Sequence, residues 1–352
     1  MTTLQSLSKH SILQHFELFP FDPKEKLTAD VASALFTELP TSCAASVSSF
    51  IESEIFYKRA CSQVARLLGC RREQHGLSYK RMFFEMQIPD LLNKMRISPS
   101  IAENIFTLKM SCAEDFPLDE VCSHFPNLNR IDIKYAVAIS SKKSRVERMP
   151  RALHMARNLV SLTVQDSFLT DADVEVMFSN EDCTSLNTIL HLNLRYNKIT
   201  SIGLALIVKY FVSSSSSILA SLDLMGNRIG GEGGSLLARD LTKNESLLTL
   251  NLRLNNIGDD FGSDLLNCLR SNTTLRSLNL SANNLGSRSA NALVALFESN
   301  NSLSLETVTI TSNAFTDEDE EAIKSCKQCF LDPRSGTSSL AFNSIEKSLM
   351  PF

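Results

Sequence analysis

Apolar residues recur along the second two thirds of the chain in one fixed local pattern. Its first clear copy spans residues 189–199, and the steps between equivalent positions of five copies are 30, 28, 28 and 30 residues. In each copy Leu, or Val and Ile in the fifth copy, alternates with polar residues, which predicts a short strand, and apolar residues at helical spacing follow, which predicts a helix. The asparagine that follows the strand in the five copies is Asn197, Asn227, Asn255, Asn283 and Asn313.

This asparagine stands where the chain turns after the strand and would leave backbone groups unpaired. Its side-chain amide can bond the backbone of the neighbouring turn, so we expect a ladder of asparagines through the array. Two weaker copies lie upstream and end in Ser167 and Ala136. We expect those two copies to be looser.

The pattern resembles the leucine-rich repeat in its long, ribonuclease-inhibitor-like form. The resemblance implies an α/β fold, a curved solenoid with parallel strands inside and helices outside. We assign residues 101–330 to about seven or eight repeats, the first ones degenerate. The acidic start of 317–330 suits the N-terminus of a capping helix, and Cys326 and Cys329 are expected as two buried thiols on it. Residues 331–352 are expected to be a tail that wraps or docks.

Residues 1–100 lack the repeat and are predicted to form a separate helical module. Residues 55–96 carry nine Lys or Arg against three Asp or Glu, and 130–157 carry eight against two, a surplus of six in each. The chain as a whole has a net charge of −4. Each basic cluster fits either a solvated helical face or the binding of an acidic partner, such as axonemal tubulin or an acidic coiled coil.

Two runs in this module carry a second resemblance. Residues 54–61 read EIFYKRAC and residues 75–85 read HGLSYKRMFFE. Together with the repeats that follow, they resemble the t-complex-associated testis-expressed family, which supplies subunit 5 of the nexin–dynein regulatory complex. Leu77 and Tyr79 depart from the small residue and the Trp of that family.

This resemblance implies a non-enzymatic scaffold in the axoneme of cilia or flagella, within the cytoplasmic cytoskeleton. It would link outer doublet microtubules and help to regulate dynein-driven motility through protein contacts. The implied partners are other coiled-coil and leucine-rich-repeat subunits of the complex, with dynein or tubulin surfaces as further possibilities. The chain would act as a monomer within this hetero-complex.

Two groups of residues are candidates for protein contacts, because aromatic and Arg side chains dominate interface energetics. The run 80–85 also fits a purely structural role, with its apolar residues in a helix core. The candidates in the N-terminal module are Tyr57, Lys58, Arg59, Tyr79, Lys80, Arg81 and Phe84. Those at outward positions of the repeats are Arg195, Tyr196, Asp223, Met225, Arg253 and Leu254.

Candidate chemistry is sparse. There is no GxGxxG or Walker-type motif, the glycines at 230–234 read as a repeat turn, and the six histidines show no metal-ligand spacing. We therefore expect no enzyme activity, no metal and no cofactor. The negative net charge argues against a protein that holds nucleic acid by charge alone, and no apolar run reaches the ~18 residues of a membrane helix. A secretory signal is not evident, and the nine scattered cysteines indicate a reducing compartment.

One other class of function fits the same pattern. Leucine-rich repeats of this type also occur in regulators of enzymes, such as ribonuclease inhibitors and GTPase-activating proteins. A soluble regulator of that kind, or a ubiquitin-ligase adaptor, is therefore the alternative to an axonemal scaffold.

Overall fold

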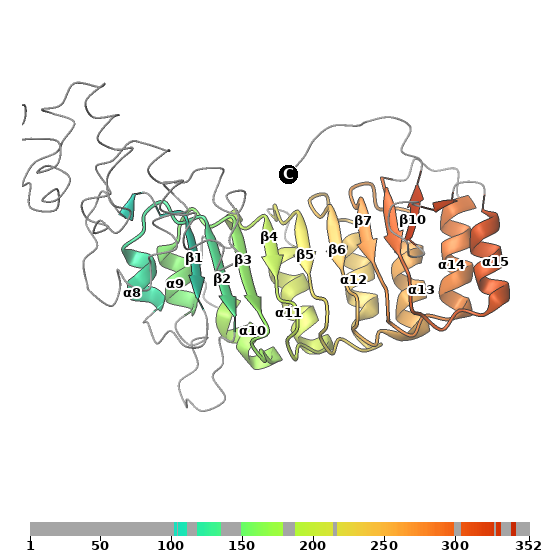
Figure 1. Ribbon diagram of the computed structural model, residues 1–352, viewed down its shortest axis with the longest axis horizontal. Helices are drawn as coiled ribbons and strands as arrows, with labels where there is room; N and C mark the ends of the chain where they lie inside the picture. The colour runs from blue at the N-terminus through green and yellow to red at the C-terminus, as the bar shows by residue number, and fades with distance from the viewer. Residues whose placement is uncertain are drawn as a thin grey trace, which may run out of the picture. The chain divides into compact units, whose positions relative to one another are not determined.

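The computed structural model describes residues 102–103, 105–110, 118–134, 149–178, 187–213, 217–298, 304–326, 329–331 and 339–342 (Figure 1). The predicted helical module at 1–100, with its basic cluster at 55–96, lies outside these residues. The chain divides into two compact units, one made of 1–109 with 120–131 and the other of 110–119 with 132–352.

The first unit holds most of strand β1 (Thr107–Met110), most of helix α8 (Leu118–Ser123) and the start of β2 (Arg130–Lys134). The backbone N–H groups of Asn129 and Arg130 both donate to the carbonyl of Phe106, at 2.9 and 3.0 Å. Leu108 and Ile131 are fully buried. The unit therefore repeats the order of strand, helix and strand that the sequence predicts further along.

In the second unit, strands and helices alternate along the chain, and Figure 1 shows the strands as one layer with the helices behind it. Strands β3 to β8 pair in parallel, each with the next. The predicted α/β solenoid is thus confirmed. The elements are α9 (Met149–Met155), β3 (Ser161–Gln165), α10 (Asp171–Phe178), β4 (His191–Asn193), α11 (Ser201–Phe211), β5 (Ser221–Asp223), α12 (Gly234–Leu241), β6 (Thr249–Asn251), α13 (Gly258–Cys268), β7 (Ser277–Asn279), α14 (Ser287–Glu298), β8 (Thr307–Thr309) and α15 (Asp317–Ser325).

The strand register explains why the period of the sequence is so regular. Leu192 pairs with Leu222 and Leu222 with Leu250, so equivalent leucines lie side by side across the sheet. All three are buried, and Phe261 and Leu265 of α13 are buried as well. Burying one such side chain contributes about 1.5–3 kcal/mol. Each repeat supplies only part of this core, so stability depends on stacking.

The turn after each strand uses the left-handed backbone conformation. The φ angle is +53° at Tyr196, +71° at Gly226 and +58° at Leu254. At each of these positions the N–H donates to a carbonyl of the following repeat, as from Tyr196 to Met225 at 2.8 Å. These bonds between repeats offset the strain of a bulky left-handed residue. The turn geometry is therefore set by the stack and not by glycine alone.

The C-terminal end of the array differs from the expected cap. Helix α15 ends at Ser325, and Cys326 is buried at its C-cap. The expectation of two thiols on this helix was wrong for Cys329, which lies in strand β9 (Cys329–Leu331). Strand β10 (Ser339–Phe342) pairs antiparallel with both β8 and β9. Part of the predicted tail thus adds a strand beside the last repeat.

Candidate protein-interaction surface

Three rows of side chains cross the turns that follow the parallel strands. Parallel pairing places equivalent residues of neighbouring repeats about 4.8 Å apart, so each row is a line of side chains on a fixed backbone. The first row is Gln165, Arg195, Met225, Arg253, Ser281 and Thr311. The second is Asp166, Tyr196, Gly226, Leu254, Ala282 and Ser312. The third, just past the ladder position, is Phe168, Lys198, Arg228, Asn256, Asn284 and Ala314.

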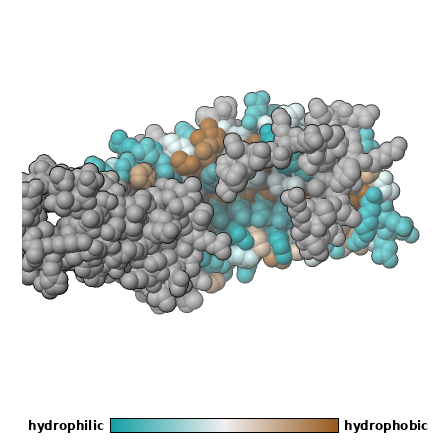
Figure 2. Space-filling model, turned by 45° about the horizontal axis from the view of Figure 1, so that its top comes forward, coloured by the Kyte–Doolittle hydropathy of each residue, from teal (hydrophilic) through white to brown (hydrophobic). Residues whose placement is uncertain are grey.

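Large and cationic side chains gather at one end of these rows. After β7 and β8 the rows hold only small or uncharged residues. After β3 to β6, Phe168, Tyr196 and Leu254 are 43%, 42% and 43% exposed, although most of the described surface in Figure 2 is hydrophilic. We name this end the turn face, which follows the arrowheads of β3 to β6 in Figure 1. It comprises Phe168, Arg195, Tyr196, Lys198, Met225, Arg228, Arg253 and Leu254.

Arg195 lies at the centre of the turn face. Its Nη2 donates to the sulfur of Met225 at 3.1 Å, and its Nε lies 3.7 Å from Oδ2 of Asp223. Its Cζ lies 5.5 Å from the centre of the Tyr196 ring. Nε is buried and makes no hydrogen bond within the described structure. A thioether is a weak acceptor, so this guanidinium keeps donor capacity that its neighbours do not use.

The other cations of the turn face have no carboxylate partner among the described residues. The Nζ of Lys198 lies 5.0 Å from the centre of the Phe168 ring, a cation–π contact. Arg228 and Arg253 are exposed. Asp223 and the half-buried Asp166 are the acidic side chains in or next to the rows over these turns. Four cations minus two carboxylates leave a local surplus of two positive charges.

The structure brings the predicted contact residues of the repeats together on this face. Arg195 touches Met225, Asp223 and Tyr196, and Arg253 lies in the same row. Phe168, Lys198 and Arg228 were missed from the sequence. They could have been found from the sequence, because they occupy the same position in each repeat, directly after the ladder position. The candidates at Tyr57, Lys58, Arg59, Tyr79, Lys80, Arg81 and Phe84 lie outside the described residues.

Asparagine side chains hold the backbone beneath the turn face. Nδ2 of Asn197 donates to the carbonyls of Val164, in the preceding repeat, and Leu194, in its own, at 2.8 and 2.9 Å. Its Oδ1 accepts from the N–H groups of Ser167 and Leu169, both at 3.1 Å. Thus the N–H of Ser167, a residue expected in a looser copy, still donates a hydrogen bond to the ladder.

The remaining ladder positions repeat this arrangement with small differences. In each, Nδ2 donates to a carbonyl of its own or the preceding repeat, as from Asn255 to Leu224 and Leu252, both at 2.9 Å. Oδ1 of Asn255 accepts no hydrogen bond within the described structure, whereas Oδ1 of Asn283 accepts from the N–H of Asn255 at 2.8 Å. The ladder ties successive turns together, so the turn face is a rigid surface. The other two members are Asn227 and Asn313.

Comparison with known protein families agrees with the repeat geometry. A family model described as "Leucine Rich repeat" matches residues 185–208, 216–238, 243–260 and 271–294. The matched residues are leucine-rich repeats. Among solved structures, an internalin (inlF) from Listeria monocytogenes is similar at 17% identity and a TM-score of 0.32, over 67% of this chain and 74% of that one. No curated protein matches the sequence. A leucine-rich-repeat array is consistent with protein–protein interaction.

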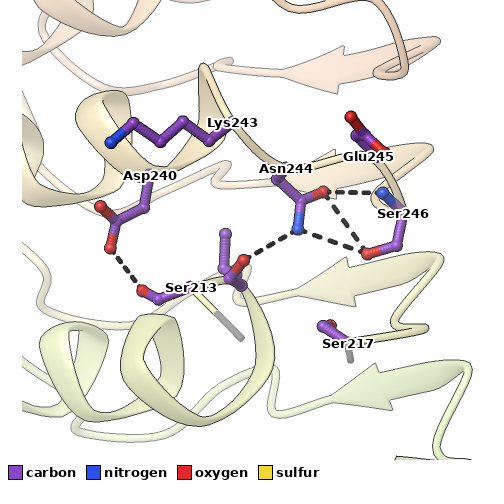
Figure 3. Close-up of a pocket in the computed structure, with 8 residues that line it drawn as sticks. Ser213, Ser217, Asp240, Lys243, Asn244, Glu245 and Ser246 are labelled. Atoms are coloured by element: carbon purple, nitrogen blue, oxygen red, sulfur yellow. Dashed lines mark hydrogen bonds between the residues drawn. The ribbon is translucent and has the colours of Figure 1, made fainter. Parts of the chain in front are cut away.

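The repeats contain a second pair of structural asparagines, in the loops that lead from helix to strand. Nδ2 of Asn244 donates to the carbonyl of Val212 at 2.9 Å (Figure 3). Its Oδ1 accepts from the N–H of Leu247 at 2.8 Å. Asn272 bonds the carbonyl of Leu241 and the N–H of Leu275 in the same way. Sequence analysis missed this pair, whose signal was its 28-residue spacing.

Asn244 also lines a cavity of about 650 Å³ on this side of the leucine-rich-repeat array. The hydroxyl of Ser213 donates to the carboxylate of Asp240 there, as Figure 3 shows. A hydrogen bond from Arg239 is the main reason that the pKa of Asp240 lies below its usual value. The hydrogen bonds of Ser213 with Asp240 and of Asn244 with Val212 join neighbouring repeats, so these polar groups have a structural role. The lining residues are Val212, Ser213, Ser217, Asp240, Lys243, Asn244, Glu245 and Ser246.

Reactive groups are few in the described part of the chain. Burial, helped by the nearby Asp264, raises the pKa of the Cys268 thiol to about 12, so it is a protonated thiol at neutral pH. No group of three or more His, Cys, Asp or Glu side chains in these segments is placed to hold a metal ion. None of the helices there is long and apolar enough to cross a bilayer.

Proposed function

We propose that the protein is a non-enzymatic scaffold subunit of the nexin–dynein regulatory complex. In this role it links outer doublet microtubules and helps to regulate dynein-driven motility through protein contacts. Support for the complex comes from the runs at 54–61 and 75–85, which resemble the t-complex-associated testis-expressed family and precede leucine-rich repeats. The observation that carries the scaffold role is the rigid turn face with its exposed aromatic and cationic side chains.

The structure of the repeats supports a binding role in a specific way. The ladder bonds the backbone of the turns, so the positions from which the side chains of the turn face project are fixed before a partner arrives. Pre-organised contacts lose less conformational entropy on binding. Aromatic and Arg side chains of this kind are enriched at protein interfaces. Coiled-coil or leucine-rich-repeat subunits of the complex, and surfaces of dynein or tubulin, are the proposed partners.

Extraction of cilia tests this proposal directly. A tagged full-length chain is expressed in motile ciliated cells, and the cilia are demembranated with detergent. We expect the chain to stay with the axonemes. A variant with Lys58, Arg59, Lys80 and Arg81 changed to Ala should be released, although the purified variant unfolds at the same temperature as the natural chain. Recovery of the natural chain in the detergent extract would contradict the proposal and favour a soluble regulator of an enzyme or a ubiquitin-ligase adaptor.

A further inference from the structure

The turn face combines two properties that are rarely found together on an unpartnered surface. Phe168, Tyr196 and Leu254 expose apolar side chains on three of four successive turns. Between them stand four cations, of which Lys198, Arg228 and Arg253 have no carboxylate partner among the described residues. An exposed surface of this kind is complementary to a ligand that covers the apolar groups and carries negative charge opposite the cations.

We infer that the turn face binds an acidic segment of a partner protein in which carboxylates alternate with aromatic or aliphatic side chains. This inference deepens the proposed function by naming the chemistry of the partner, and it rests on the scaffold role. Charge complementarity carries it, because the face is positive within a chain whose net charge is −4. The carboxylates would pair with Arg228, Arg253 and the unused donors of Arg195.

The apolar anchors decide between a protein segment and another polyanion. Tyr196 and Leu254 lie in the same row, two repeats apart, which corresponds to a separation of about 10 Å. In an extended chain residues three apart are separated by about 10 Å as well. An acidic segment with an apolar residue at every third position would therefore meet both anchors. A nucleic acid supplies the negative charge but no aliphatic side chain for Leu254.

The limits of the site follow from the rows. After β7 the same positions hold Ser281, Ala282 and Asn284, which offer neither charge nor large apolar surface. Hydroxyl groups within the rows bond one another there, as Thr311 donates to Ser281 at 2.9 Å. The segment should therefore cross the turns after β3 to β6 and leave the last two repeats uncovered.

Fluorescence anisotropy with the purified full-length chain tests the inference. The probe is a labelled peptide of repeated Glu-Glu-Phe units, and its matched control repeats Glu-Glu-Ser. We expect the Phe peptide to bind at least about tenfold more tightly than the Ser peptide. If the two peptides bind equally tightly, recognition is by charge alone and the inference is overturned. The same holds if single-stranded DNA displaces the labelled Phe peptide as well as unlabelled Phe peptide does.

Matched variants locate the binding site on the protein. Arg228→Glu with Arg253→Glu should weaken binding of the Phe peptide by about tenfold or more. Lys209→Glu with Lys243→Glu makes the same change of net charge on the helical side of the repeats and should leave binding unchanged. If both double variants lose the same affinity for the Phe peptide, the inference is overturned. Thermal unfolding checks that each pair folds, which is expected because these side chains are exposed and have no ion pair among the described residues.

A second pair of variants tests the anchors. Tyr196→Asn and Leu254→Asn replace the apolar side chains with asparagine, a residue that tolerates the left-handed backbone conformation. The preference for the Phe peptide over the Ser peptide should then disappear, and its survival would contradict the inference. Peptide binding by the purified chain is independent of cilia. Failure here and failure of axonemal retention are therefore separate results.

Discussion

The ring of Tyr196 lies against Gly226 of the next repeat. A Cβ atom on Gly226 would come within 2.5 Å of Cδ1 of Tyr196 and 2.8 Å of Cε1. Equivalent turn positions carry Leu254 and Ala282 in the same left-handed conformation, so the backbone alone does not require glycine at 226. The glycine makes room for the ring, and the ring in turn lies over the backbone of the following turn.

Gly226→Ala should therefore act mainly through Tyr196. We expect a loss of about 1–2 kcal/mol in the free energy of unfolding, since the ring must move and an alanine enters a left-handed turn. The double variant with Tyr196→Ala should recover part of the loss. Urea unfolding of the single and double variants measures this coupling. If the losses in free energy of unfolding of the two single variants simply add in the double variant, the Tyr196 ring is not the reason for a glycine at position 226.

Gly262→Ala should lower stability, although alanine normally stabilises a helix by up to about 1 kcal/mol relative to glycine. Gly262 is buried on α13, and a Cβ there would lie 2.6 Å from Oγ of Ser289 and still closer to the Leu285 side chain. The expected cost is about 1–3 kcal/mol from overpacking. Thermal unfolding checks the sign, and a higher melting temperature would contradict the close helix packing.

Asp259 caps the helix of the next repeat. Its carboxylate accepts from the N–H groups of Gly286, Arg288 and Ser289 at 2.8–3.0 Å. Desolvation raises the pKa of this carboxyl, but hydrogen bonds from Ser289, Gly286 and Arg288 outweigh it and lower the pKa below its usual 3.8. A depressed folded-state pKa gives stability that is present above the unfolded value and is lost as the pH falls through the folded value.

Asp259→Asn should thus cost about 1 kcal/mol at neutral pH, because an amide nitrogen in place of Oδ2 cannot accept the N–H of Arg288. The difference from the natural chain should begin to shrink as the pH falls below about 4, near the unfolded-state pKa, and should disappear once Asp259 is protonated in the folded chain, at its lower pKa. Its neighbour Asp260 provides a control, because it is exposed and pairs only with the exposed Arg288, so Asp260→Asn should change little. Melting temperatures measured across a range of pH compare the stability of the two variants. An equal loss of stability in Asp259→Asn and Asp260→Asn would argue against the cap.

The asparagine ladder gives a stability prediction that needs no partner. Asn255→Ala removes the Nδ2 hydrogen bonds to the buried carbonyls of Leu224 and Leu252, although Asn227 and Asn283 still donate to these carbonyls. The two lost bonds should together cost about 1–3 kcal/mol. The exposed Asn267 on α13 makes only a long contact with Ser263, at 3.5 Å, so Asn267→Ala should be close to neutral. Calorimetry of the two variants compares them. An unchanged thermal midpoint for Asn255→Ala would contradict the role of the ladder.

The repeats could be predicted from sequence because their signals are local. Leu192 and its equivalents recur at nearly constant steps, and the strand-and-helix order follows from spacing within one repeat. Contacts between repeats could not be predicted in this way. The cap that Asp259 places on α14, and the ring that Tyr196 lays against Gly226, depend on which residues the stack brings together.

The end of the array shows the same limit. Acidic residues after Thr316 predict the start of α15 well, because they suit a helix N-terminus. The end of the helix at Ser325 and the pairing of β10 with β8 are tertiary features. Short strands such as Cys329–Leu331 form only where a sheet edge supplies partners, so local composition predicted a longer helix than the one that forms.

The most direct test of the central claim is imaging of ciliary axonemes from cells that lack this gene. Cryo-electron tomography would compare the link between outer doublets in these axonemes with the link in normal ones and in a strain rescued by the full-length chain. The account predicts that density is missing from the nexin–dynein regulatory complex and returns on rescue. An intact link in the absence of the protein would contradict it.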